Sequence, residues 1–174
     1  VREGDWNYYG IYGGKDPEIA VVASGKYSNN KRVGEWEERQ GLINSKGMYK
    51  NGLKQGLWIY YDLEVEGAPI ILKGKFEQGV PEGTWSYYFV DEETAKTKVV
   101  AEGNMHNGCF EGEWKTYHWS SGNVCSRGNS MPNTAPTDSA NQFDVFIFFR
   151  YLSQLMEYYN DAEVRKTGVW NYYH

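Results

Sequence analysis

The residues with the clearest potential for chemistry are two histidines and two cysteines in one short stretch: His106, Cys109, His118 and Cys125. These residue types bind zinc. If residues 120–123 form a hairpin loop, His118 faces Cys125, whereas Cys109 lies in the turn before Gly112. At about 3.4 Å per strand residue, the two halves of the group lie about 20 Å apart. One zinc ion cannot hold all four, so we predict no metal site.

The same distance also separates Cys109 from Cys125. A disulfide requires Cα atoms within about 7 Å of each other, so Cys109 and Cys125 should both be free thiols. Two free cysteines favour a reducing, intracellular compartment.

Other catalytic patterns are absent from the sequence. No serine stands in a nucleophile elbow, and no glycine-rich segment has the context of a phosphate-binding loop. The acidic pairs Glu37-Glu38 and Glu92-Glu93 are expected on solvated faces and loops. We therefore predict that the chain is not an enzyme and holds no cofactor.

Composition and charge exclude two further classes of function. The net charge of −5 argues against nucleic acid, whose recognition needs basic surfaces, and gives no support for peripheral contact with an anionic membrane. No apolar run is long enough to form a transmembrane segment. The 174 residues include 15 Tyr, 7 Trp and 20 Gly, a composition typical of strands and turns.

One pattern organises almost the whole chain. A Gly-x-aromatic-x-Asn-Gly segment is followed by three residues and then by Gly-x-Trp-x-Tyr-Tyr, most clearly in residues 47–61. Full or shortened forms of the second half recur at residues 4–9, 34–36, 56–61, 83–88, 112–117 and 168–173. Their first glycines stand 30, 22, 27, 29 and then 56 residues apart. Such self-similarity indicates tandem β-hairpin units of about 28 residues, roughly six in number.

The last interval is two units long, which predicts a degenerate unit at 141–167. Residues 129–140 are polar and rich in turn formers, so we expect a loop-rich insertion there. Residues 143–159 are apolar with a spacing that also fits a helix, and periodicity alone does not separate the two structures. We assign strands on the phase of the repeat, and the helix stays as the alternative. The unit that begins at Gly34 is the shortest, and we expect a tight loop in it around Gly41 and at 44–46.

A strand has a side-chain period of two, which gives each motif two faces. We expect the tryptophans to form one buried row, each ring covering a glycine on a neighbouring strand: Trp6, Trp36, Trp58, Trp85, Trp114 and Trp170. The opposite face is mostly polar, and Leu57 with Ile59 is the exception. Together with the second tyrosines of the motifs, these residues form the candidate interaction surface: Leu57, Ile59, Tyr61, Tyr88, Tyr9 and Tyr173.

These units resemble the variant form of the membrane occupation and recognition nexus (MORN) repeat. The likeness covers nearly the whole chain, is best at 47–61, 74–88 and 103–117, and fails mainly at 129–157. It implies an elongated, twisted antiparallel sheet that serves as an adhesive or scaffolding module. Some bacterial proteins of the variant type are regarded as antitoxins. The Trp-x-Tyr-Tyr segment departs from the standard unit, so the resemblance gives little support for the membrane role in the family name.

The sequence thus predicts an all-β single array over residues 1–174, which we expect to be a section of a longer protein. Its expected function is non-catalytic binding of a protein partner, or scaffolding within an assembly. Two alternatives remain open at this stage. One is an antitoxin-like neutraliser of a protein toxin, and the other is an aromatic platform for glycans or lipid headgroups.

Overall fold

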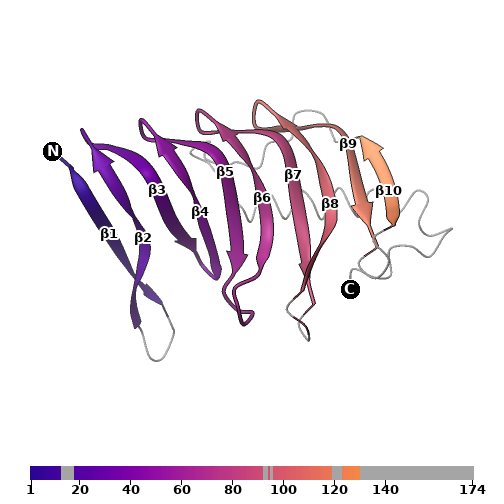
Figure 1. Cartoon of the computed structure of the whole chain (residues 1–174), viewed down its shortest axis with the longest axis horizontal. Coiled ribbons are helices and arrows are strands. Elements are labelled where there is room, and N and C mark those ends of the chain that lie inside the picture. The colour runs from indigo at the N-terminus through magenta and orange to yellow at the C-terminus, as the bar shows by residue number, and fades with distance from the viewer. Residues whose placement is uncertain (13–17, 92–93, 95, 119–122, 130–174) are drawn as a thin grey trace.

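The computed structural model describes residues 1–12, 18–91, 94, 96–118 and 123–129. These residues form ten strands in one antiparallel sheet, each paired with the next in chain order (Figure 1), and they contain no helix. The all-β antiparallel prediction is therefore confirmed for the described residues. The strands are β1 (Gly4–Tyr12), β2 (Glu18–Ser28), β3 (Lys31–Gln40), β4 (Ile43–Lys50), β5 (Leu53–Asp62), β6 (Ile70–Glu77), β7 (Val80–Val90), β8 (Thr97–His106), β9 (Cys109–Tyr117) and β10 (Val124–Asn129).

Four tight turns, which connect β2 to β3, β4 to β5, β6 to β7 and β8 to β9, share the same backbone geometry. In each, both central residues have positive φ, for example 54° at Asn51 and 86° at Gly52. Positive φ at both positions defines the type I′ turn, for which Asn-Gly is the preferred sequence. The second residue of each turn also donates its N–H to a backbone carbonyl at or just before the start of the strand that precedes that hairpin, at 2.8–3.1 Å. The four bonds run from Asn30 to Arg2, Gly52 to Arg32, Gly79 to Lys54 and Gly108 to Pro81.

Tryptophan rings lie directly over glycines of the preceding strand. A Cβ atom built on Gly47 would stand 2.4 Å from the indole of Trp58, and one on Gly74 would stand 2.0 Å from that of Trp85. No side chain fits into that space, so only glycine is compatible with the ring at these positions. The same contact joins Gly25 to Trp36 and Gly103 to Trp114.

Aromatic side chains from neighbouring strands stand edge-on between the tryptophans. Tyr49 lies between Trp36 and Trp58 at centroid distances of 5.9 and 5.4 Å, with interplanar angles of 72° and 87°. This T-shaped arrangement places the positive ring edge against the negative ring face. Phe76 occupies the corresponding place between Trp58 and Trp85. The four tryptophans from Trp36 to Trp114 are at most 2% exposed, whereas Trp6 on β1 is 37% exposed.

The first glycine of the Gly-x-Trp segment has a different role from the glycine under the ring. Gly56 has a φ of 72° and no atom within 4 Å of a would-be Cβ. The pairing of β4 with β5 skips Gly56 and Leu57, because Gly47 pairs with Trp58 while Met48 pairs with Gln55. A bulge of this kind bends the strand and increases its local twist.

Two local expectations were wrong. Residues 44–46 belong to β4, and the loop there is confined to a turn at residues 41–42, because the pairing of β3 with β4 continues to Gln40 and Ile43. Cys125 does not face His118: Val124 pairs with Tyr117, Ser126 pairs with Thr116, and a bulge lies between them. The difference is present before the bulge, because the N–H of His118 donates to the carbonyl of Asn123 at 2.9 Å, so His118 lies opposite Asn123.

Several sequence predictions fall outside the described residues. These are the loop-rich insertion at 129–140 apart from Asn129, which ends β10, the degenerate unit at 141–167, the question of strand or helix at 143–159, and the residues Trp170 and Tyr173.

We predict that substitution of Trp85 by alanine lowers the free energy of unfolding by about 3–5 kcal/mol, because it removes a fully buried indole and leaves a cavity over Gly74. Urea unfolding measures the change. The matched substitution Trp6→Ala should cost clearly less, because the Trp6 ring is partly in solvent. Equal losses for the two variants would contradict the assigned burial.

Candidate interaction surface

The face of the sheet opposite the tryptophan row carries an apolar patch at its centre. Leu57, Ile59 and Tyr61 alternate along β5 with Trp58 and Tyr60, which are buried on the other face. Leu57 is 50% exposed, and Ile59 and Tyr61 are partly exposed. The sequence expectation that these three residues share one face away from the core therefore agrees with the geometry.

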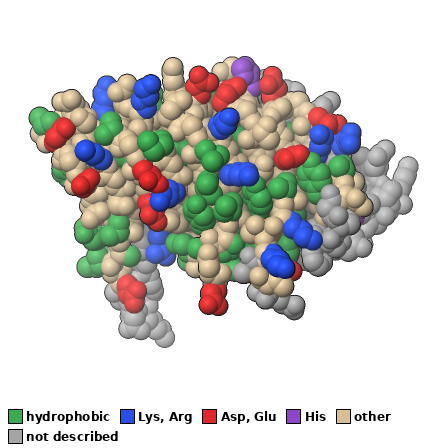
Figure 2. Space-filling model, in the orientation of Figure 1, with side chains coloured by type: hydrophobic (Ala, Val, Ile, Leu, Met, Phe, Trp, Pro, Cys, Tyr) green, Lys and Arg blue, Asp and Glu red, His purple; other side chains and the backbone are tan. Residues whose placement is uncertain are grey.

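Neighbouring strands extend this patch. Ile70 of β6 pairs directly with Tyr61, so their side chains lie on the same face. Tyr88 of β7 lies on that face as well, because it stands two residues after Ser86, which pairs with Lys73. The central patch is defined here as Leu57, Ile59, Tyr61, Ile70 and Tyr88. Figure 2 shows hydrophobic side chains gathered near the middle of one face of the sheet, with basic side chains among them.

Two lysines of β6 lie inside the central patch. Lys73 pairs with Ile59, and Lys75 pairs with Leu57. The Nζ atom of Lys73 stands 5.2 Å from the ring centroid of Tyr88, a cation–π contact. Among the described residues, neither lysine has a carboxylate within ion-pair distance. By contrast, Lys46, on the other side of Ile59, forms an ion pair with Glu35 at 2.8 Å.

The remaining members of the predicted surface are not part of this patch. Tyr9 is 64% exposed but lies on β1, four strands away from β5. Tyr173 lies outside the described residues. Sequence reasoning also overlooked Lys73, Lys75 and Ile70. The signal for the lysines was available, because residues on either side of Gly74 must point away from the indole that covers it.

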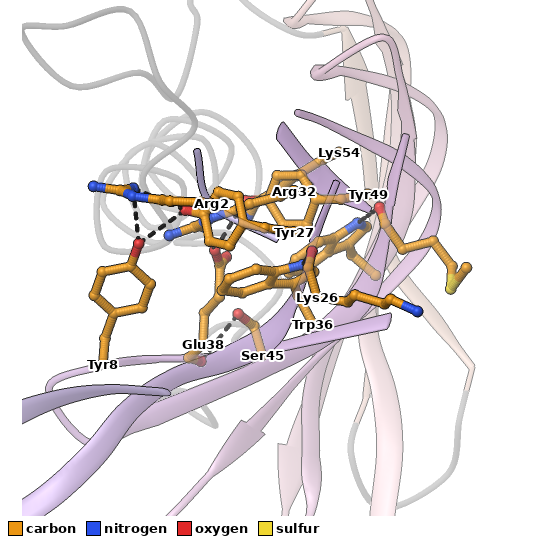
Figure 3. Close-up of polar contacts among 12 residues, drawn as sticks. Arg2, Tyr8, Lys26, Tyr27, Arg32, Trp36, Glu38, Ser45, Tyr49 and Lys54 are labelled. Carbon is orange, nitrogen blue, oxygen red and sulfur yellow. Dashed lines mark hydrogen bonds and ion pairs between the residues drawn. The ribbon is translucent and has the colours of Figure 1, made fainter. Parts of the chain in front are cut away.

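A charged cluster lies on the other face, beside the tryptophan row (Figure 3). The Glu38 carboxylate forms ion pairs with Arg32 and with Lys54, the latter at 2.9 Å, and accepts a hydrogen bond from the Tyr49 hydroxyl at 2.8 Å. The side chains of Glu38, Arg32 and Lys54 are only 20–28% exposed.

The two cations of this cluster also cover tryptophan rings. The Cζ atom of Arg32 stands 4.3 Å from the Trp36 ring, and the Nζ atom of Lys54 stands 3.7 Å from the Trp58 ring. Both cations precede their tryptophan by four residues, as Arg2 precedes Trp6. This spacing is the sequence signal that could have revealed the contacts.

The charges in the cluster shift one another's pKa values. Burial opposes ionisation of Glu38, but Lys54, Tyr49 and Arg32 outweigh it and hold the pKa of the carboxyl below its ordinary value. Burial lowers the pKa of Lys54 although Glu38 acts in the opposite direction. Burial, together with the Glu38 carboxylate, raises the pKa of Tyr49 above its ordinary range. The Glu38 carboxylate is thus paired with two cations.

The groove and the cysteines are the other described features whose residue types could take part in chemistry. A shallow open groove crosses β1 to β4, and its one acidic side chain, Glu37, accepts a hydrogen bond from the Asn44 amide. Cys109 is a free cysteine and begins β9, whereas Cys125 follows the far end of that strand. Within the described ranges, no group of three or more His, Cys, Asp or Glu side chains could hold a metal ion.

The described part of the chain contains no helix long and apolar enough to cross a membrane. A scan against models of protein families and a search of curated proteins found no match to this chain. The resemblance to MORN repeats therefore rests on the sequence motifs alone.

We predict that substitution of Glu38 by glutamine destabilises the fold by about 1–3 kcal/mol at neutral pH, because it leaves Arg32 and Lys54 without their carboxylate. The folded-state pKa of Glu38 is depressed, so its contribution is complete above the unfolded pKa near 4.5 and is lost as the pH falls through the folded value.

Urea unfolding at a series of pH values tests this prediction. The difference between wild type and Glu38→Gln should shrink as the pH falls below about 4.5. Glu37→Gln is the matched control, since Glu37 is exposed on the opposite face, and it should change stability little. A difference for Glu38→Gln that is independent of pH would contradict the assigned ion pairs.

Proposed function

We propose that this chain is a non-catalytic protein-binding module, built as an array of about six β-hairpin units of about 28 residues each. In this proposal the tryptophan row holds the units together, and the face opposite it binds a protein partner through the central patch. The module would serve as a structural part of a larger assembly, as the resemblance to MORN repeats suggests.

The central patch is the observation that carries the proposal. Half of the Leu57 side chain is exposed, and the patch spans three adjacent strands, whose direct pairing makes it continuous. Contiguous apolar surface with polar surroundings on a folded protein marks a site of interaction. Tyrosine and aliphatic anchors at the centre of such a surface are typical of residues that contribute most to binding.

The charges in the patch indicate the kind of partner. The chain carries a net charge of −5, yet the two described cations in the middle of the patch have no carboxylate partner among the described residues. A partner that places acidic side chains next to apolar ones would contact Leu57 and Ile59 and pair with Lys73 and Lys75. Such complementarity favours one partner over others and speeds association.

The alternatives from the sequence have weaker support. A tryptophan platform for glycans or lipid headgroups needs exposed indole faces, but the four inner tryptophans are buried. An antitoxin-like neutraliser would also use a protein-binding surface, and it differs in having one toxic partner at fixed stoichiometry.

We predict that substitution of Leu57 by glutamate abolishes partner binding without unfolding the sheet. The tagged protein is captured from its native cells together with proteins retained at stoichiometric yield, as wild type and as two variants. The second variant is Leu53→Glu, a matched control because Leu53 lies on the same strand, is 48% exposed and gains the same charge.

A partner that Leu53→Glu retains and Leu57→Glu loses by about tenfold or more, with equal melting temperatures, would support the proposal. A partner retained by both variants, or lost equally by both, would show that the central patch is not the binding site.

A further inference from the structure

The face that carries the central patch holds acidic as well as basic side chains, and strand pairing fixes their places. Glu37 of β3 pairs with Lys46 of β4. Lys46 pairs in turn with Ile59 of β5, which pairs with Lys73 of β6. Directly paired residues lie side by side on one face, so these four residues form a row across four strands. The row begins with a carboxylate and ends with an ammonium group.

A second row runs beside the first, one step nearer the tight turns. Glu35 pairs with Met48 at one end, and Leu57 pairs with Lys75 at the other. Met48 and Leu57 stand on the adjacent strands β4 and β5, each two residues from a member of the first row, and each is 50% exposed. This row also begins with a carboxylate and ends with an ammonium group, with two exposed apolar side chains between them.

The two rows are complementary to themselves. A half-turn about an axis that is parallel to the strands and lies between β4 and β5 exchanges β4 with β5 and β3 with β6. When a second copy of the chain is placed by this half-turn, face to face with the first, Lys73 of each copy meets Glu37 of the other. In the second row, Lys75 meets Glu35 in the same way. Each row thus supplies an ion pair on either side of the axis.

The remaining residues of the rows also match. Met48 meets Leu57, so that two half-exposed apolar side chains cover each other. Lys46 meets Ile59, and its aliphatic stem packs there while its ammonium group keeps the ion pair with Glu35 at 2.8 Å. The half-turn brings no two charges of like sign into opposition within the rows.

We propose that the partner of the central patch is a second copy of this chain, bound face to face about this axis. The inference rests on the proposed function, because it names the partner of the same surface. A second copy presents acidic side chains next to apolar ones, since Glu35 pairs directly with Met48. A two-fold interface uses one patch on both copies and closes as a dimer.

The same arrangement fills the groove beside the patch. The groove has a volume of about 430 Å³ and is lined mainly by residues of β1 to β4, among them Val21 and Glu37. The half-turn places β6 and β7 of the second copy over β3 and β2. Lys73 and Tyr88, which form a cation–π contact at 5.2 Å, then project toward the groove. There Glu37 is the one acidic side chain, and Val21 is 44% exposed.

Sheet twist does not separate the two copies. Strands in a sheet twist with one hand, and a half-turn about an axis parallel to the strands yields a surface with the same twist. Two such faces therefore follow each other at about 10 Å. Six strands with three outward side chains each cover about 29 Å by about 17 Å, or about 1,000 Å² for both copies. That area is close to the lower limit for a specific interface, so we expect dissociation in the micromolar range.

Charge reversal tests the proposal, with molecular mass measured by sedimentation equilibrium. The wild-type chain should be a dimer at about 100 µM. Lys73→Glu and Glu37→Lys should each self-associate at least about tenfold more weakly, because like charges then meet across the axis. An equimolar mixture of these two variants should regain the dimer, since opposite charges again meet at both contacts. Rescue within one copy is impossible, because β3 and β6 are three strands apart.

Glu111→Lys is the matched control, because Glu111 is exposed on β9, outside the contact, and the charge change equals that of Glu37→Lys. It should dimerise as the wild type does. A wild-type chain that stays monomeric at about 1 mM, or a mixture of Lys73→Glu and Glu37→Lys that does not dimerise, would overturn the proposal. Capture from native cells keeps the proposed function separate: a monomeric chain that retains a different protein through Leu57 overturns this inference alone.

Discussion

The contact between an indole ring and the glycine of the preceding strand is the interaction on which the rest of the sheet depends. It fixes the register of neighbouring strands, because Trp58 can lie only where Gly47 leaves room for it. A one-residue slip would bring a side chain under the ring and turn every apolar residue to the other face. The edge-on rings of Tyr49 and Phe76 then fill the space between successive tryptophans.

This constraint divides the two faces of the sheet into different roles. The tryptophan face is committed to packing, and where it carries charge, as at Glu38, the charge is paired with cations that also cover the rings. The opposite face is free of that constraint, so it accommodates Leu57 and Ile59 next to Lys73 at the centre of the sheet. Trp6 lies on β1, which has no described strand before it, and is 37% exposed.

Much of the fold could be read from the sequence because the motif encodes it locally. Asn51-Gly52 predicts a hairpin turn, and the φ values of both residues agree. The period of two placed Leu57, Ile59 and Tyr61 on one face without any knowledge of tertiary contacts. These features depend on neighbours in the sequence, which is why local reasoning was sufficient.

Local reasoning could not predict features that depend on the register between strands or on residues far apart in the sequence. The pairing of β10 with β9 is displaced by two residues from the counted register, because Val124 pairs with Tyr117, so Cys125 does not face His118. The period of two places Glu38 on the face of Trp36 and Glu37 on the other, but the ion pair of Glu38 with Lys54 joins β3 to β5, which are not neighbours, and a local pattern does not reveal it. Tyr9 and Tyr61 lie four strands apart in the sheet. Comparing the faces of single motifs showed that both tyrosines point away from the tryptophans, but it did not show how far apart they are.

A double-mutant cycle between Gly25 and Trp36 tests the central claim most directly. Gly25→Ala should destabilise the wild-type chain by about 1–3 kcal/mol, because the new Cβ meets the Trp36 ring. In a Trp36→Ala background the same change should be neutral or stabilising by up to about 1 kcal/mol, because alanine restricts the unfolded chain and the ring is gone. Equal destabilisation in both backgrounds would contradict the claim that the indole is what requires a glycine.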